Sequence, residues 1–436
     1  MRGSPRATGT MAMLSTAALL GLTACSGGGG GDDSGPLEVW SRSAPDPAKT
    51  YEKVFAAFTE KTGVKVDYKP VMEFDQQLQT RAGSKDLPDV LINDSGSLGN
   101  YQSQGLLTPI EPGDIKGNED IADSDWKGSV GVDGKTYGIP FSRQAFGTFV
   151  NKEWREKLGK DVPETWADLE ELATAFAKDD PDGNGKDDTY GMVVPGSTEN
   201  GYLGWWASSY LWQGGGDIVA DTGDGTFESA VASPENEKTV EWIRTQFCTK
   251  GNVQPGALTA TTSNAPFFPE GTAGIYLTGP YVMAEYDKKL GKEKYEVIPT
   301  PAGPGGATTL AEGENIYFGA GSGKEADKKQ LAEFLISPEG QEIAMTGTSQ
   351  PVVRLPVNTG LDAAEVRKDD RWKVFQDSYE NDAKAFPSAI NFTPVRQGLA
   401  EGLNAVMADC DSDIPAALDE LDTAINDELE SQDVLK

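Results

Sequence analysis

The stretch PDPAKTYEKVFAAFTEKTG, residues 45–63, together with VKVDY, residues 64–68, decides the fold class of this chain. Asp46 is expected to cap a helix that has Pro47 at its first position, and Gly63 is expected to end it. The apolar residues in between share the three- and four-residue spacing of a helix with one buried face: Tyr51, Val54, Phe55 and Phe58. The alternation in VKVDY then predicts a half-buried strand directly after the helix.

Helical and strand patterns continue to alternate along the chain. Residues 88–94, PDVLIND, are a short apolar run between turn-forming residues, which is typical of a buried parallel strand. Thr165 is expected to cap a helix with Asp168 three residues on, TYGMVV at 189–194 predicts a strand, and 325–335 predicts a helix. The acidic C-terminal stretch also keeps helical spacing, at Leu418, Leu421, Ile425 and Leu429. The sequence therefore predicts an α/β fold with mostly parallel sheets.

Composition excludes several classes of function. A chain of 436 residues suggests two domains, and a formal net charge of −31 would repel a phosphate backbone, so nucleic acid is not an expected partner. The chain contains no histidine, which removes Ser-His-Asp and Cys-His nucleophiles and the commonest transition-metal ligand.

The N-terminus has the layout of an export signal. Two arginines precede a short apolar run and then LTAC, which resembles a bacterial lipobox ending at Cys25. We therefore expect a lipoprotein signal peptide over 1–24, lipidation of Cys25, and a glycine-rich tether over 25–36 that cannot pack. The alternative is an ordinary cleaved signal with an incidental cysteine.

Only Cys248 and Cys410 remain after Cys25. An exported protein meets an oxidising compartment, so one disulfide is expected between them. In the chain-entropy model, a loop of this span stabilises the fold by about 5 kcal/mol at most.

A series of segments, in this order, resembles the extracellular solute-binding proteins of ATP-driven importers, specifically the maltose-binding-like group. Besides the lipobox, the matching segments are LEVWS, TGVKVDYKP, LPDVLIND, GKTYGIPFSRQAFGTFVNKEW, PETWADLEELATAFAK, FFPEGTAGIYLTGPYVM, FLISPEGQEIAM and TSQPVVRLPV. They cover the chain from Leu37 to beyond Val357.

This resemblance implies two α/β lobes joined by three crossings, with the ligand bound between the lobes. The crossings are expected near 142–147, 311–315 and 351–355. The resulting lobes have these ranges: 37–143 plus 314–352 for the N-lobe, and 144–313 plus 353–436 for the C-lobe.

Rings for stacking on a sugar come from GYLGWWASSYLWQGGG, residues 201–216. A sugar offers an apolar C–H face and a rim of hydroxyls, which suits aromatic rings combined with charged and amide groups. Trp205 and Trp206 lie on different sides of any regular element, so at least one is expected to reach the ligand. The resemblance adds Tyr281, in the family's Gly-Pro-aromatic turn, where tryptophan is usual. The alternative places such rings in the core.

Polar ligand contacts are implied by the resemblance at the ends of strands and in the crossings. These residues are Ser41, Arg42, Asp94, Glu314, Asn315 and Arg354. Strand ends are where open α/β sheets place ligands. For each charged residue the alternative is a solvated charge or a salt bridge between lobes.

DPDGNGKDDTYG has the alternating acidic pattern of a calcium-binding loop. The ligand positions would be Asp180, Asp182, Asn184, the Lys186 carbonyl and Asp188. The bidentate glutamate of the twelfth position is replaced by Gly191, so an acidic turn is the equal alternative. No other cofactor is expected.

These observations predict a monomeric receptor, not an enzyme, that is lipid-anchored on the outer face of the cell membrane. It would deliver a mono- or oligosaccharide to the transmembrane permease subunits of an ATP-driven importer. Two alternatives remain open: a non-sugar solute such as a polyol phosphate, polyamine or peptide, and a surface polysaccharide hydrolase that uses two carboxylates.

Overall fold

Helix α1, Pro45–Thr62, begins two residues earlier than the sequence suggests in the computed structural model. Its N-cap is Ala44, which makes no side-chain cap hydrogen bond, so the expectation that Asp46 caps the helix is wrong. Pro45 occupies the first turn, where a fixed φ and a missing N–H are tolerated, and this places Asp46 inside the helix. Gly63 ends the helix with a φ of 80°, as predicted.

The structure describes residues 35–263, 265–347 and 350–436. The expected signal peptide, Cys25 and almost all of the tether lie outside the described residues. Within that part of the chain, no helix is both long enough and apolar enough to cross a membrane.

The first sheet has the strand order β12-β4-β11-β3-β1-β2, with β13 paired to β11. Its strands are β1 (Leu37–Ser41), β2 (Val66–Pro70), β3 (Val90–Asp94), β4 (Gly138–Ala145), β11 (Thr309–Phe318), β12 (Leu355–Pro356) and β13 (Ala383–Lys384). The second sheet has the order β10-β5-β9-β6. Its strands are β5 (Gly147–Asn151), β6 (Tyr190–Val193), β9 (Ala273–Thr278) and β10 (Tyr295–Ile298). A separate hairpin joins β7 (Val219–Gly223) to β8 (Thr226–Ser229).

Both sheets are mixed. Strand β1 runs parallel to β2 and β3, and β6 runs parallel to β9. Strand β11 is antiparallel to β3 and β4, and β5 is antiparallel to β9 and β10. The two-lobed α/β class is confirmed, while the parallel share is smaller than expected because β11 runs back against its neighbours.

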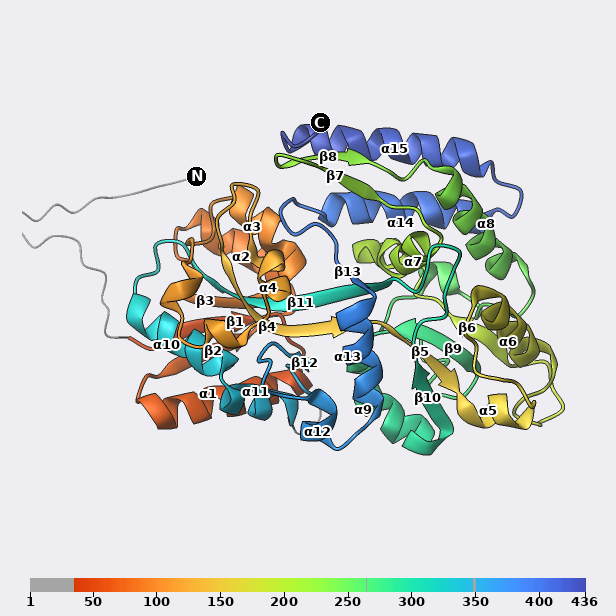
Figure 1. The fold of residues 1–436 in the computed structure, drawn as a ribbon, viewed down its shortest axis with the longest axis horizontal. Helices are drawn as coiled ribbons and strands as arrows, with labels where there is room; N and C mark the ends of the chain where they lie inside the picture. The colour runs from red at the N-terminus through yellow and green to blue at the C-terminus, as the bar shows by residue number, and fades with distance from the viewer. Residues whose placement is uncertain (1–34, 264, 348–349) are drawn as a thin grey trace, which may run out of the picture. The chain divides into compact units, whose positions relative to one another are not determined.

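Helices pack against both sheets (Figure 1). The first sheet contacts α1 and α10, and the second contacts α5 and α6. The longer helices after α1 are α2 (Phe74–Gly83), α6 (Trp166–Lys178), α7 (Tyr202–Gln213), α8 (Pro234–Cys248), α10 (Glu325–Ile336), α11 (Pro338–Met345), α13 (Arg371–Asn381), α14 (Thr393–Ala408) and α15 (Ile414–Ser431). The shorter ones are α3 (Leu98–Ser103), α4 (Asp123–Trp126), α5 (Lys152–Lys157), α9 (Met283–Tyr286) and α12 (Ala363–Arg367).

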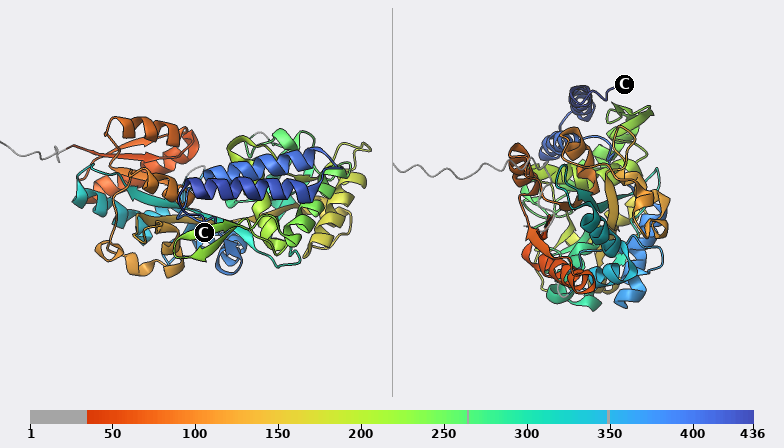
Figure 2. Two further views of the ribbon diagram at one scale, coloured as in Figure 1. Left: turned by 90° about the horizontal axis from the view of Figure 1, so that it is seen from above. Right: turned by 90° about the vertical axis from the view of Figure 1, so that its left-hand side faces the viewer.

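Several local predictions are confirmed. Thr165 caps α6 in a capping box with Asp168. The C-terminal stretch forms α15, which lies beside α14 in the views of Figures 1 and 2 and buries the apolar residues predicted for it. Cys248, at the end of α8, forms a disulfide with Cys410, with 5.9 Å between the Cα atoms.

The chain passes from the first sheet to the second between Ala145, the last residue of β4, and Gly147, the first residue of β5. The third crossing differs from the expectation. The resemblance implies that residues from 353 onward belong to the second lobe. Leu355 pairs with Arg143 in β4, so this segment remains on the first sheet. Helix α13 contacts both β4 and β5, and it carries the chain toward the second sheet. The division into lobes itself stays a prediction.

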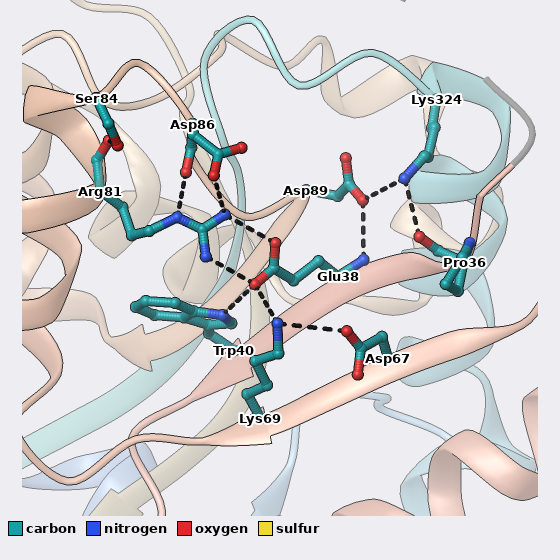
Figure 3. Close-up of polar contacts among 10 residues, drawn as sticks. All are labelled: Pro36, Glu38, Trp40, Asp67, Lys69, Arg81, Ser84, Asp86, Asp89 and Lys324. Atoms are coloured by element: carbon teal, nitrogen blue, oxygen red, sulfur yellow. Dashed lines mark hydrogen bonds and ion pairs between the residues drawn. The ribbon is translucent and has the colours of Figure 1, made fainter. Parts of the chain in front are cut away.

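A polar network holds the start of β1 in place (Figure 3). Glu38 receives two hydrogen bonds of 2.9 Å from the Arg81 guanidinium and one of 2.7 Å from Lys69. The Trp40 indole Nε1 donates to the same carboxylate at 2.9 Å. Burial raises the pKa of Glu38, but these hydrogen bonds outweigh it and lower the pKa from 4.5 to about 2.

Candidate functional site

Polar side chains meet where β3 ends and β11 passes between β3 and β4. Glu314 in β11 lies opposite Asp94, the last residue of β3, and Glu312 lies opposite Gln144 in β4. A register shift between Glu314 and Asn315 re-aims the strand at this point, as bulges near binding sites do. We call the following residues the charged junction: Arg42, Asp94, Gln144, Glu312, Glu314 and Arg354.

The first ion pair of the charged junction joins Arg42 to Asp94 at 2.8 Å. The Asp94 carboxylate raises the pKa of Arg42, which therefore keeps its charge. Both side chains are open to solvent, with exposed fractions of 55% and 38%. An exposed pair of this kind contributes little to stability, so its polar atoms are available to a ligand.

The second ion pair joins Arg354 to Glu314 at 2.9 Å and is more enclosed, with exposed fractions of 18% and 16%. The Tyr51 hydroxyl also donates to Glu314, at 3.3 Å. The backbone N–H of Arg354 donates to Ser142 in β4 at 3.1 Å, which fixes the segment that carries the guanidinium. The charged junction is thus built from β1, β3, β4, β11 and the chain before β12.

Glu312, like Gln144, is a residue of the charged junction that the sequence did not reveal. One of its oxygens accepts from the Trp205 indole Nε1 at 2.7 Å, and the other accepts from Gln144 at 3.0 Å. Burial, with the nearby charge of Asp94 second, raises the pKa of Glu312. The available signal was the period-two spacing of Glu312 and Glu314 in β11, which puts both on one face.

Trp205 is the ring of the aromatic stretch that reaches this site. It is 8% exposed, and its ring meets Phe146 edge-on with the centroids 4.5 Å apart. Tyr202, one helical turn earlier in α7, approaches it edge-on at 6.4 Å. The orientation of the Trp205 indole is therefore fixed by one hydrogen bond and two ring contacts.

Tyr281 stands on the short turn after β9. Its hydroxyl lies 2.7 Å from the Thr278 hydroxyl, and burial raises its pKa. A Cβ on Gly279 would meet the Tyr281 ring at 2.6 Å, so the glycine makes room for the aromatic side chain. The same Cβ would also meet the Gln144 amide oxygen at 3.4 Å, so the Tyr281 turn lies next to a residue of the charged junction.

Three of the predicted ligand contacts are placed elsewhere. Trp206 is 2% exposed and packs on Tyr210 with the ring centroids 4.7 Å apart, so the structure favours the core interpretation. Asn315 is fully buried and donates to the Gly128 carbonyl at 3.0 Å. Ser41 is also buried, and its hydroxyl lies 2.7 Å from that of Tyr68.

Trp212, at the end of α7, lines a separate cavity of about 450 Å³ that we call the Trp212 cavity. Trp212 donates to Asp217 at 2.9 Å, Lys384 contacts the same carboxylate at 2.6 Å, and the Lys384 ammonium lies 5.2 Å from the Trp212 ring centroid. Lys127, next to the Gly128 that binds Asn315, also lines it. The Trp212 cavity is thus separate from the charged junction, since none of its lining residues belongs to that junction.

The proposed calcium loop is closed by its own hydrogen bonds. Asp180 accepts from the backbone N–H groups of Gly183 and Gly185, and the Asn184 amide donates to Asp182 and Asp188. Within the described ranges, no group of three or more Asp, Glu or Cys side chains is arranged to hold a metal ion. The geometry therefore gives calcium no support, and the assignment stays a prediction.

Comparison with known proteins identifies the family. The model of the bacterial extracellular solute-binding protein family matches residues 43–342. Among relatives, the lipoprotein LipO of Bacillus subtilis is 31% identical over 36% of this chain, and the match spans only 32% of LipO. The maltodextrin-binding protein MdxE of the same species is 25% identical over 81% of this chain and 80% of its own length.

Solved structures agree on the fold. Maltose-bound MalE3 of T. maritima is 20% identical in sequence and superposes with a TM-score of 0.76, over 91% of this chain and 99% of its own. The two mixed sheets, the passage of the chain from β4 to β5 and the matched family model lead to one conclusion: this chain belongs to the bacterial extracellular solute-binding proteins.

Proposed function

We propose that this protein is a surface-tethered receptor that captures a mono- or oligosaccharide at the charged junction and delivers it to an ATP-driven importer. The observation that carries the proposal is the Trp205 ring, held by Glu312 beside the ion-paired Asp94 and Glu314. An aromatic face next to carboxylates, an amide and two guanidinium groups matches the apolar face and hydroxyl rim of a sugar. The similarity to the maltodextrin-binding protein MdxE and to maltose-bound MalE3 supports this class of ligand.

Capture would act through a hinge. The strands β4 and β11 and the segment before β12 carry residues of the charged junction and lie where the lobes are expected to join. A ligand that contacts both lobes favours the closed arrangement by its differential affinity for the two states. The permease subunits of the importer would then recognise the closed form.

The hydrolase alternative needs one carboxyl group as an acid and a second as a nucleophile or base. In the charged junction, the Asp94 and Glu314 carboxylates are each held in an ion pair with an arginine, so the structure presents them as fixed binding groups. This arrangement supports binding without turnover. Chromatography of an oligosaccharide after long incubation tests it, and any cleavage would contradict a pure receptor.

The membrane anchor is the second part of the proposal. It rests on the lipobox-like LTAC before Cys25 and on the glycine-rich residues after it. A Cys25→Ser variant should appear in the medium instead of the membrane fraction and should fail to incorporate a labelled fatty acid. Equal membrane retention of the variant would contradict lipidation at Cys25.

Calcium is retained as a structural proposal on the spacing of Asp180, Asp182 and Asn184 alone. Bound calcium would replace the hydrogen bonds inside the loop, at a distance from the charged junction. Excess calcium should then raise the melting temperature, and a chelator should reverse the rise. A melt that neither reagent changes would leave the loop as an acidic turn.

The decisive experiment for sugar binding is a thermal-shift screen of residues 35–436 against neutral and acidic mono- and oligosaccharides, with tryptophan fluorescence read in parallel. A ligand at a hundred times its dissociation constant stabilises the folded state by about 2.7 kcal/mol. A shift in melting that is lost in Trp205→Ala and kept in Trp212→Ala would support the charged junction. A cooperative melt that no saccharide changes would contradict the sugar assignment and direct the screen to polyamines, peptides and polyol phosphates.

A further inference from the structure

Glu312 is bound differently from the other two carboxylates of the charged junction. Asp94 and Glu314 each contact a guanidinium, whereas both contacts of Glu312 are neutral donors, Trp205 and Gln144. Within the described ranges, Glu312 forms no salt bridge. A carboxylate offers about four lone-pair sites. Each oxygen of Glu312 therefore keeps the capacity to accept one more hydrogen bond.

The position of Glu312 relative to Trp205 defines where such a donor would stand. An indole N–H lies in the plane of its ring, so the Glu312 carboxylate borders the edge of Trp205 and does not cover a ring face. The edge-on contact with Phe146 fixes this plane from the side of the crossing. A ligand ring stacked on Trp205 would then bring its rim hydroxyls next to Glu312.

The charges around Glu312 come from several elements. Asp94, on β3, acts on it as a like charge, and Arg396, on α14, acts as an opposite charge. Tyr281, on the turn after β9, also lies within its electrostatic reach, and Gln144 on β4 and Trp205 on α7 are its hydrogen-bond partners. Arg42, the residue after β1, is a further opposite charge that acts on Glu312. Asp94 and Glu314 each contact a guanidinium directly, so Glu312 is the carboxylate of these three whose hydrogen bonds leave acceptor sites toward a ligand ring on Trp205.

We propose that Glu312 is the specificity-determining residue of the charged junction, which accepts hydroxyl hydrogen bonds from an uncharged ring stacked on Trp205 and rejects rings that carry a carboxylate or phosphate at that rim. This inference rests on the proposed saccharide-binding function and narrows its ligand to neutral sugars. The physical reason for the rejection is that a ligand carboxylate or phosphate would place acceptor oxygens of like charge against the Glu312 carboxylate, with no proton to share between them.

The first test measures the binding of each neutral saccharide that raises the melting temperature, and the binding of its uronate and its phosphate ester. The proteins compared are the wild type, Glu312→Gln and the control Glu60→Gln, which changes an exposed residue of α1. Glu312→Gln keeps the size of the side chain and removes the charge. We expect it to weaken the neutral ligand by about tenfold or more, since hydrogen bonds to a charged group are the stronger ones. We also expect it to reduce the discrimination against the uronate, while Glu60→Gln changes neither.

The second test needs no ligand. The fluorescence difference between wild type and Trp205→Phe isolates Trp205, and it should change between neutral and mildly acid pH because protonation converts the Glu312 acceptor into a donor. The raised pKa of Glu312 puts this change above the range of an ordinary glutamate. The change should be absent in Glu312→Gln. Should Glu312→Gln fail to fold, Glu312→Met, which keeps a similar side-chain length and also removes the charge, takes its place in both tests.

The outcomes separate this proposal from the proposed function. If neutral sugars bind but Glu312→Gln keeps both their affinity and the discrimination against uronates, the role of Glu312 is overturned and the receptor function stands. Tighter binding of uronates than of neutral sugars by the wild type would also overturn the role of Glu312. If no saccharide of any charge binds, both proposals fall together. A fluorescence change lost in Trp212→Phe and kept in Trp205→Phe would move the ligand to the Trp212 cavity and overturn the assignment.

Discussion

Glu38 offers a quantitative test of the structure at a site remote from the charged junction. Its carboxylate contacts the two terminal nitrogens of Arg81, the Lys69 ammonium and the Trp40 indole, and it is only 20% exposed. The pKa falls from 4.5 to about 2 on folding. This difference corresponds to roughly 3 kcal/mol of stabilisation by the ionised form.

The sign of the pH dependence follows from that lowered pKa. A carboxyl group whose pKa is lower in the folded state stabilises the protein fully above its unfolded value of 4.5, and this stabilisation is lost as the pH falls toward about 2. Glu38→Gln imitates the protonated form at all pH values. It should therefore lower the free energy of unfolding by about 3 kcal/mol near neutral pH and by about half as much near pH 3.

The assay is urea unfolding followed by circular dichroism, for the wild type, Glu38→Gln and the exposed control Glu60→Gln, at neutral and acid pH. The control should differ little from the wild type at either pH, since it makes no comparable contacts. The reasoning would be refuted by a Glu38→Gln variant within about 0.5 kcal/mol of the wild type near neutral pH, which is the range of ordinary surface substitutions. A deficit that stays constant on acidification would refute the linkage argument.

Three further predictions concern the disulfide, the Tyr281 turn and the enclosed ion pair. Reducing the disulfide should lower the free energy of unfolding by up to about 5 kcal/mol, because it closes a loop of 162 residues, and an identical melt with and without reductant would contradict this. Gly279→Ala should displace the Tyr281 ring and weaken a bound ligand by roughly tenfold, measured by titration calorimetry, whereas unchanged affinity would remove Tyr281 from the site. Arg354→Met should cost about 3 kcal/mol in urea unfolding because it leaves Glu314 unpaired, and adding Glu314→Gln should recover part of that loss. Equal effects of Arg354→Met in both backgrounds would show that the two residues are not coupled.

The local elements were accessible from sequence because their signals are local. The spacing of apolar residues marked α1 and α15, Gly63 marked a helix end, and Thr165 with Asp168 marked a helix start. The predicted start of α1 was wrong by two residues, because Pro45 satisfies the rule for a first helical position as well as Pro47 does. The disulfide needed only a count, since two cysteines remained after Cys25.

The candidate site was accessible only in part. Arg42 with Asp94, and Glu314 with Arg354, were implied by the resemblance, and the structure brings each pair together. Glu312 was missed because nothing in the sequence shows that a glutamate of β11 will face the indole of α7, 107 positions earlier in the chain. The antiparallel pairing of β11 was also missed, because it depends on contacts between distant segments. The direction of β11 is set by how the strand returns between β3 and β4.

The aromatic stretch at 201–216 shows which features the sequence determines and which only the tertiary structure decides. By itself, the sequence determined that Trp205 and Trp206 point in different directions, because neighbouring side chains of any regular element cannot share one side. The tertiary structure decided what each ring does: Trp205 binds Glu312, Trp206 packs in the core, and Trp212 lines a cavity. The physical reason is that backbone periodicity is set by neighbours in the chain, whereas the environment of a side chain is set by whichever distant segments pack against that face of the helix.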